Sequence, residues 1–93
     1  MRVPTTQRQG IPGNKFAVLV EYGCVDRAIA NLGYRRLARV FNGVRNAFPE
    51  LSPARVADIV YGAVEELRAN AHRYRAHRSL SHYLFSLAYN RAL

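Results

Sequence analysis

The chain has 93 residues, 49% of them hydrophobic, which suffices for one small domain with a packed core and excludes wholesale disorder. Its 14 Lys and Arg residues outnumber its 6 Asp and Glu residues, so the formal net charge is +8 at pH 7 and a polyanionic partner is expected. The longest apolar run, residues 16–20, is too short to span a membrane.

Residues 1–13 are expected to form a flexible tail, because prolines and glycines break regular structure there and the other residues offer little to a core. Residues 14–93 should then form a single helical domain. The tail has no apolar stretch of signal-peptide length, and the lone Cys24 leaves no internal disulfide, so we expect a cytoplasmic protein.

The first helix is expected over residues 14–33, where Asn14 suits the N-cap and Gly33 suits a left-handed position after the helix end. Gly23 weakens the middle of this helix. A buried strand over residues 15–22 is the alternative, since that apolar run is short and β-branched. The helical pattern places one set of residues on a single face: Val18, Tyr22, Val25, Ile29 and Leu32.

The second helix is expected over residues 34–48 and should end before Pro49, which cannot continue it. Its apolar residues follow steps of 3 and 4, as in a heptad repeat, although two heptads are too few for a coiled coil. They should therefore pack in the core of the domain: Tyr34, Leu37, Phe41, Val44 and Phe48.

The third helix has the clearest start signal in the chain. Ser52 is a good N-cap, and Pro53 fits the first helical position, where a missing N–H costs nothing. We expect this helix to run to about residue 76, with one apolar face formed by Val56, Ile59, Val60, Ala63, Val64, Leu67, Ala71 and Tyr74.

A fourth helix is expected near residues 79–91, with Ser79 or Ser81 as its N-cap. A continuous helix over residues 53–91 is the alternative. A break is favoured because the apolar face of the third helix would otherwise drift onto Arg78. The predicted fold class is therefore all-α, a compact bundle of three or four helices. The apolar residues of the fourth helix are Leu80, Tyr83, Leu84, Leu87 and Ala88.

Residues 72–78, HRYRAHR, do not form one patch on a helix, because helical geometry spreads them around the axis. Tyr74 falls on the apolar face, whereas Arg68, His72 and Arg75 form either a phosphate-facing stripe or a solvated face. The three histidines are spaced five apart, but two metal ligands on one helix want a spacing of three or four. We expect no metal, no cofactor and, without a phosphate-binding glycine loop or a paired acid and base, no enzyme.

The second helix carries the stronger basic surface, because no acidic residue lies between Arg27 and Phe48. Polar residues spaced 4, 3 and 4 should line one exposed stripe, with Arg36 beside it: Arg35, Arg39, Asn42 and Asn46. Arginines four residues apart repel each other, so the compensating negative charge should come from a partner. The alternative is that an acidic residue from elsewhere neutralises the stripe after folding; the candidates are Glu50, Glu65 and Glu66.

These features predict a small basic module that contacts nucleic acid mainly through phosphates, with low sequence specificity. The alternative is a protein-interaction module, such as an inhibitor, adaptor or assembly subunit of the kind found in phages and mobile elements, that docks its arginine face on an acidic protein. The candidate contact residues are the same for both: Arg35, Arg36, Arg39, Asn42, Asn46, Arg68, His72 and Arg75.

Two common nucleic-acid-binding arrangements are not evident. The helix that follows the turn at residues 48–53 starts apolar and acidic, unlike the reader helix of a helix-turn-helix. The exposed aromatic residues of an RNA-binding motif are not visible either. A chain of this size can also gain stability by forming a homo-oligomer.

Overall fold

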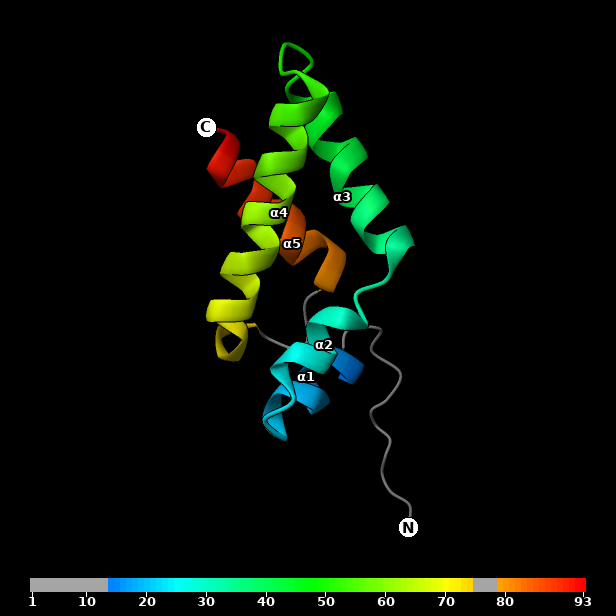
Figure 1. Ribbon diagram of the computed structural model, residues 1–93, viewed down its shortest axis with the longest axis vertical. Coiled ribbons are helices and arrows are strands. Elements are labelled where there is room, and N and C mark those ends of the chain that lie inside the picture. Colours follow the sequence, from blue (N-terminus) through cyan, green and yellow to red (C-terminus); the bar gives the residue numbers. More distant parts are fainter. Residues whose placement is uncertain (1–13, 75–78) are drawn as a thin grey trace.

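The computed structural model describes residues 14–74 and 79–93 (Figure 1). Within these ranges the chain forms helices and no strand: α1 (Asn14–Glu21), α2 (Val25–Ala30), α3 (Tyr34–Ala47), α4 (Pro53–Ala69), the 3-10 helix η2 (Ala71–Arg73) and α5 (Leu80–Ala92). The predicted all-α bundle is confirmed, and the strand alternative for residues 15–22 is wrong. The predicted tail, residues 1–13, lies outside the described residues.

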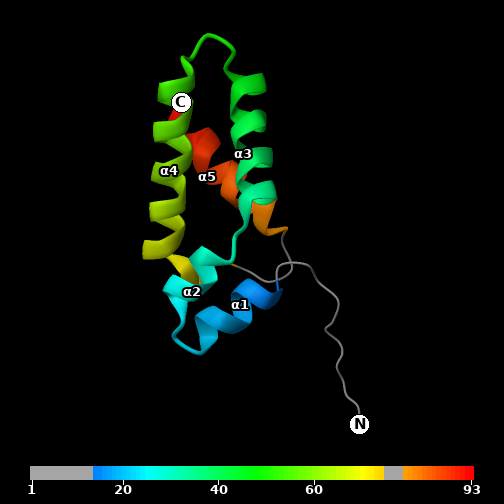
Figure 2. The ribbon, with the colours of Figure 1, turned by 45° about the vertical axis from the view of Figure 1, so that its right-hand side comes forward.

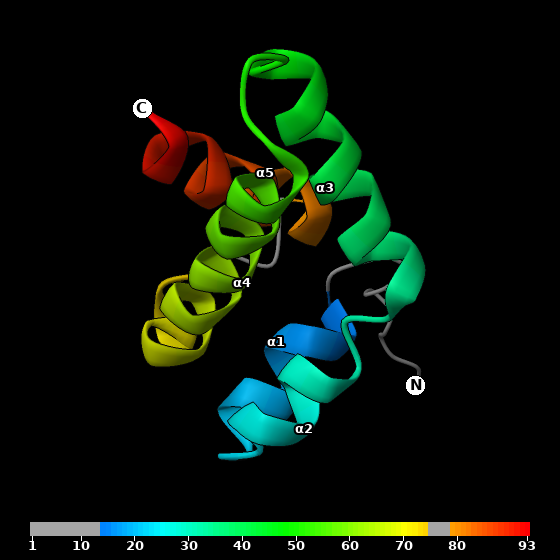
Figure 3. The ribbon, with the colours of Figure 1, turned by 45° about the horizontal axis from the view of Figure 1, so that its top comes forward.

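The helices form two groups that meet at one end of the bundle. Helices α3 and α4 run antiparallel, and α5 packs across one face of this pair (Figure 2). Helices α1 and α2 pack on each other (Figure 3). Helix α1 contacts η2, and α2 contacts α4. The opposite face of the α3–α4 pair is therefore not covered by α5.

The predicted first helix is two helices, and Gly23 is the cause. Gly23 has φ +78°, a left-handed conformation that glycine adopts without a Cβ penalty. Its N–H donates to the Val20 carbonyl at 3.0 Å, and the Cys24 N–H donates to the Leu19 carbonyl at 2.8 Å. These two bonds form a Schellman motif, which ends α1.

This break changes the inward face of the segment, since the chain restarts as α2 with a new rotation. Phe16, Ala28 and Leu32 are buried, whereas Val18 and Tyr22, predicted on the inner face, are exposed. Gly33 has a positive φ, as predicted. Its ψ of 151°, together with a φ of 84°, places it outside the left-handed helical region that was expected. It stands at the N-cap of α3 and not simply after a helix end.

Helix α3 forms as predicted, but its inner face is rotated from the predicted one. Val40 and Val44 are buried, while Leu37, Phe41 and Phe48 are half-buried against the core. Tyr34, which the heptad pattern placed in the core, has 85% of its surface exposed. Helix α3 packs on both α4 and α5, and Val40 rather than Tyr34 belongs to its buried face.

Helix α4 begins as predicted. The Ser52 hydroxyl accepts a hydrogen bond of 3.2 Å from the Arg55 N–H, and Pro53 occupies the first helical position. The helix ends at Ala69 and not near residue 76, because Asn70 leaves helical geometry and its side-chain amide donates to the Glu66 carbonyl. Asparagine competes with the helical backbone for such bonds and so favours helix ends.

The start of α5 is confirmed as well. The Ser79 hydroxyl accepts a hydrogen bond of 3.3 Å from the His82 N–H, so Ser79 is the N-cap and Ser81 is not. The continuous helix over residues 53–91 is wrong, since α4, η2 and α5 are separate elements.

Replacing Ser52 with alanine should lower the free energy of unfolding by about 1 kcal/mol, because the Arg55 N–H loses its side-chain acceptor. Urea denaturation followed by circular dichroism measures this loss. Ser81→Ala is the matched control, since Ser81 caps no helix end, and it should leave stability nearly unchanged. An equal loss in both variants would show that the cap bond contributes nothing specific.

The core lies where α3, α4 and α5 meet, and it continues to α1 and η2 through aromatic residues. Tyr74 is buried as predicted and meets the Phe16 ring edge to face, with the ring centroids 5.6 Å apart. The Tyr83 ring also packs against Tyr74, with the two ring centroids 5.4 Å apart. Burial raises the pKa of the Tyr74 phenol above its ordinary value, and the Arg36 guanidinium opposes that shift.

Candidate functional site

The exposed polar line predicted on α3 is present. Arg35, Arg39, Asn42 and Asn46, hereafter the arginine stripe, are all exposed. None of them takes part in an ion pair with the residues that the structure describes. Helical geometry keeps them within about 60° of one another around the α3 axis. The stripe is therefore an ordered set of donors that faces solvent.

The acidic residues that could neutralise the stripe are largely engaged elsewhere. Asp26 and Glu65 both pair with Arg68, and Glu66 pairs with Arg91 at 3.3 Å. Among the described residues, every ion pair thus involves an arginine outside α3. The alternative that Glu65 or Glu66 neutralises the stripe is not supported, and Glu50 forms no ion pair in this part of the chain.

Arg36 does not lie free beside the stripe as expected. Its side chain is half-buried, and Nη1 donates a 2.8 Å hydrogen bond to the carbonyl of Leu32, which lies between α2 and α3. Its charge also acts on the buried Tyr74 phenol. Arg36 therefore bonds back to the segment between α2 and α3, an interaction that sequence spacing does not reveal.

The second candidate stripe does not form on one helix. Helix α4 ends at Ala69, so Arg68 and His72 do not share a helical face, and His72 is exposed in η2. Arg68 is held by its two acidic partners. Arg75 lies outside the described residues. The structure therefore brings the α3 candidates together on one surface, and it does not place Arg68 and His72 on that surface as a second stripe.

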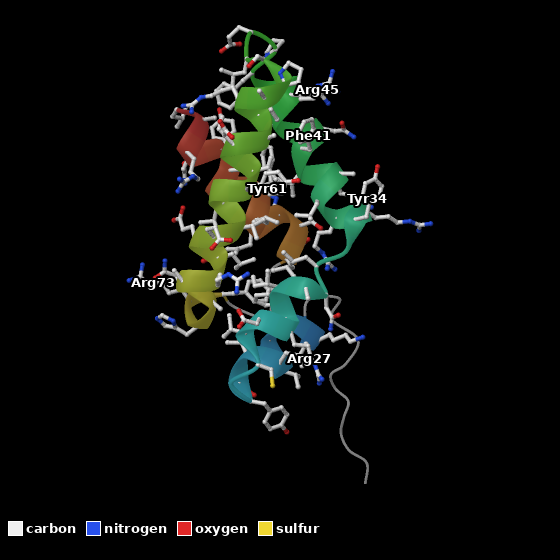
Figure 4. The ribbon with its side chains drawn as sticks, viewed as in Figure 1. Arg27, Tyr34, Phe41, Arg45, Tyr61 and Arg73 are labelled. Carbon is white, nitrogen blue, oxygen red and sulfur yellow. The ribbon has the colours of Figure 1, made fainter. Side chains whose placement is uncertain are left out.

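A groove between α3 and α4 was not predicted from the sequence. It has a volume of about 390 Å³ and is lined only by residues of these two helices. Figure 4 shows Tyr34, Phe41 and Arg45 along α3 and Tyr61 on α4. Tyr61 is 66% exposed, and none of the described residues that line the groove carries a carboxylate. We call these lining residues, with Leu37 and Asn42, the aromatic groove.

The position of the aromatic groove follows from where α5 packs. A Cβ at Gly43 would lie 2.9 Å from the Phe85 ring, so this side of α3 faces α5. Tyr34, Phe41 and Arg45 lie about 160–200° around the helix from Gly43. They therefore belong to the face that α5 leaves uncovered.

The arginine stripe and the aromatic groove are neighbours on α3. Asn42 belongs to both, and it separates the arginines on one side from the tyrosine and phenylalanine on the other. Such a surface can bind an anion with its guanidinium groups and a flat apolar group with its rings. The available signal in the sequence was Tyr61, an aromatic residue lying off the apolar face of its helix.

No protein-family model, curated protein or solved structure matches this chain. Among the described residues, no helix has the length and apolar character needed to cross a membrane. The same part of the chain brings no three His, Cys, Asp or Glu side chains together in a way that could hold a metal ion. The function is therefore argued from the surface of α3 and α4 alone.

Proposed function

We propose that this protein is a small basic binding module, and not an enzyme, that contacts nucleic acid mainly through phosphates. The observation that carries this proposal is the arginine stripe: Arg35 and Arg39 are exposed four residues apart, with no ion-pair partner among the described residues. Arginine pairs with phosphate through two parallel hydrogen bonds, which relieves the repulsion between the two cations.

The remaining members of the stripe support contacts of the same kind. Asn42 and Asn46 are exposed amides that can donate to phosphate oxygens. Contacts to phosphate oxygens carry no sequence information, so binding through this stripe should have low sequence specificity. Cytoplasmic nucleic acid is the proposed target, since Cys24 would remain a free thiol there.

Arg35→Ala and Arg39→Ala should each weaken binding to unrelated nucleic acid sequences to a similar extent, because phosphate contacts carry no sequence information. Each variant should also reduce the slope of log affinity against log salt concentration by about 0.7–0.9, through the loss of counterion release. Fluorescence anisotropy over a series of salt concentrations measures both effects.

Arg73→Ala is the matched control. It removes the same charge from an exposed residue of η2 that lies, in the view of Figure 4, on the side of α4 away from α3. Its salt slope should remain that of the unmodified protein. Weak binding by the unmodified protein at physiological salt, together with loss of a specific acidic protein partner in the Arg35 and Arg39 variants, would replace this proposal by the protein-docking alternative.

A further inference from the structure

The two exposed tyrosines of the aromatic groove have no packing role that explains them. Tyr34 and Tyr61 come from different helices, and 85% and 66% of their surfaces are exposed. Both line one hollow, together with the half-buried Phe41 ring. Exposed aromatic rings gathered in a groove mark a binding surface more often than single exposed residues do.

The charge around the aromatic groove indicates an anionic occupant. Among the described residues, Arg45 is the only charged one that lines it, and the arginine stripe adjoins it through Asn42. A ligand with both an anionic group and a planar ring would pair with the arginines and stack on the aromatic side chains. A second copy of this chain would bring another +8 against the same surface, so self-association through this face is disfavoured.

Nucleic acid offers rings and phosphates together, but its two forms offer them differently. In a duplex the base faces are stacked on one another and only their edges are accessible. In a single strand the bases can turn out and stack on aromatic side chains while the phosphates follow a basic surface. The volume of about 390 Å³ lies within the range of pockets that hold small organic ligands, a size compatible with a single base.

We propose that the aromatic groove binds a base of single-stranded nucleic acid, stacked on Tyr34 and Tyr61, while the arginine stripe holds the adjoining phosphates. This inference rests on the proposed function and assigns the form of nucleic acid that the protein prefers. Arg45 contacts the same strand from the far end of the groove.

The test compares three labelled ligands of equal length with the full chain: single-stranded oligothymidylate of about 12 nucleotides, which is within the usual site size of such modules, its abasic counterpart and a duplex. The unmodified protein should bind oligothymidylate about tenfold more tightly than the abasic strand, since each stacked base contributes roughly this factor. The abasic strand keeps the phosphates and lacks the rings, so this difference isolates stacking.

Tyr34→Ala and Tyr61→Ala should each remove most of that tenfold difference and leave binding to the abasic strand unchanged. Their salt slopes should stay those of the unmodified protein, because no phosphate contact is lost. Tyr22→Ala is the control: Tyr22 is 79% exposed but does not line the groove, and its replacement should change nothing. All three residues are exposed, and thermal melts should show that folding is retained.

A fluorescent variant gives an independent measurement. The chain has no tryptophan, so Tyr34→Trp introduces a single one in the groove. Oligothymidylate should quench its emission and the abasic strand should not.

The outcomes separate the two proposals. Equal binding of both single strands by the unmodified protein, unaffected by the Tyr34 and Tyr61 changes, overturns the stacking inference and leaves phosphate binding standing. Failure of all three ligands to bind overturns the proposed function and the inference with it.

Discussion

Replacing Leu67 with alanine should lower the free energy of unfolding by about 2–5 kcal/mol, the usual cost of truncating a large buried aliphatic side chain. Leu67 lies on the inner face of α4 with 1% of its surface exposed. A domain of this size has a total stability of about 5–14 kcal/mol, so the change removes a large share of it. Urea denaturation monitored by circular dichroism measures the difference.

Leu93→Ala is the matched control, because it makes the same chemical change at a residue that is 82% exposed. Its free energy of unfolding should be within about 0.5 kcal/mol of the unmodified protein, as for most surface substitutions. Similar stability in the Leu67 and Leu93 variants would mean that α4 does not bury this face.

Gly33→Ala should destabilise the protein by about 1–3 kcal/mol through backbone strain alone. Gly33 has φ +84° and ψ 151°, a region that is nearly restricted to glycine. A Cβ at this position would meet nothing closer than the Asn31 carbonyl oxygen at 3.9 Å, so steric crowding is not the cause. Thermal and chemical denaturation of the variant measure the cost.

Gly62→Ala serves as the comparison, since Gly62 lies inside α4 and does not have positive φ. The three atoms nearest to an added Cβ belong to the guanidinium of Arg91, at 2.6–2.9 Å, and this far end of a long, partly exposed side chain can move aside. Alanine also favours a helix by up to about 1 kcal/mol over glycine. This variant should be neutral or more stable, and an equal loss in both glycine variants would contradict the strain argument.

The elements that could be predicted are those set by local chemistry. Ser52 followed by Pro53 marks the start of α4 without reference to the rest of the chain, and Pro49 excludes a longer α3. The predictions that were wrong concern where helices end. Gly23 could be a weak point within one helix or the end of a helix, and only its two Schellman hydrogen bonds show which.

The candidate site was predicted only in part, because local spacing reveals contacts within one helix but not contacts between distant residues. The arginine stripe follows from helical spacing on α3 alone, so its exposure could be expected. The pairing of Arg68 with Asp26 joins residues 42 positions apart and has no local signal. Arg36 turns back to the Leu32 carbonyl, which spacing does not predict. Tyr34 was misplaced because the heptad pattern cannot tell where a helical face leaves the core.

The division of the bundle into two groups of helices has a consequence for how the chain opens. Helices α1 and α2 pack on the remainder through η2 and α4, with contacts such as the Phe16–Tyr74 ring pair and the exposed Asp26–Arg68 ion pair. Helices α3, α4 and α5 share the main core of buried aliphatic residues. Local opening is easiest where few buried contacts must be broken. We therefore expect the α1–α2 pair to open before the core formed by α3, α4 and α5, so that the surface of α3 and α4 stays folded in that opening.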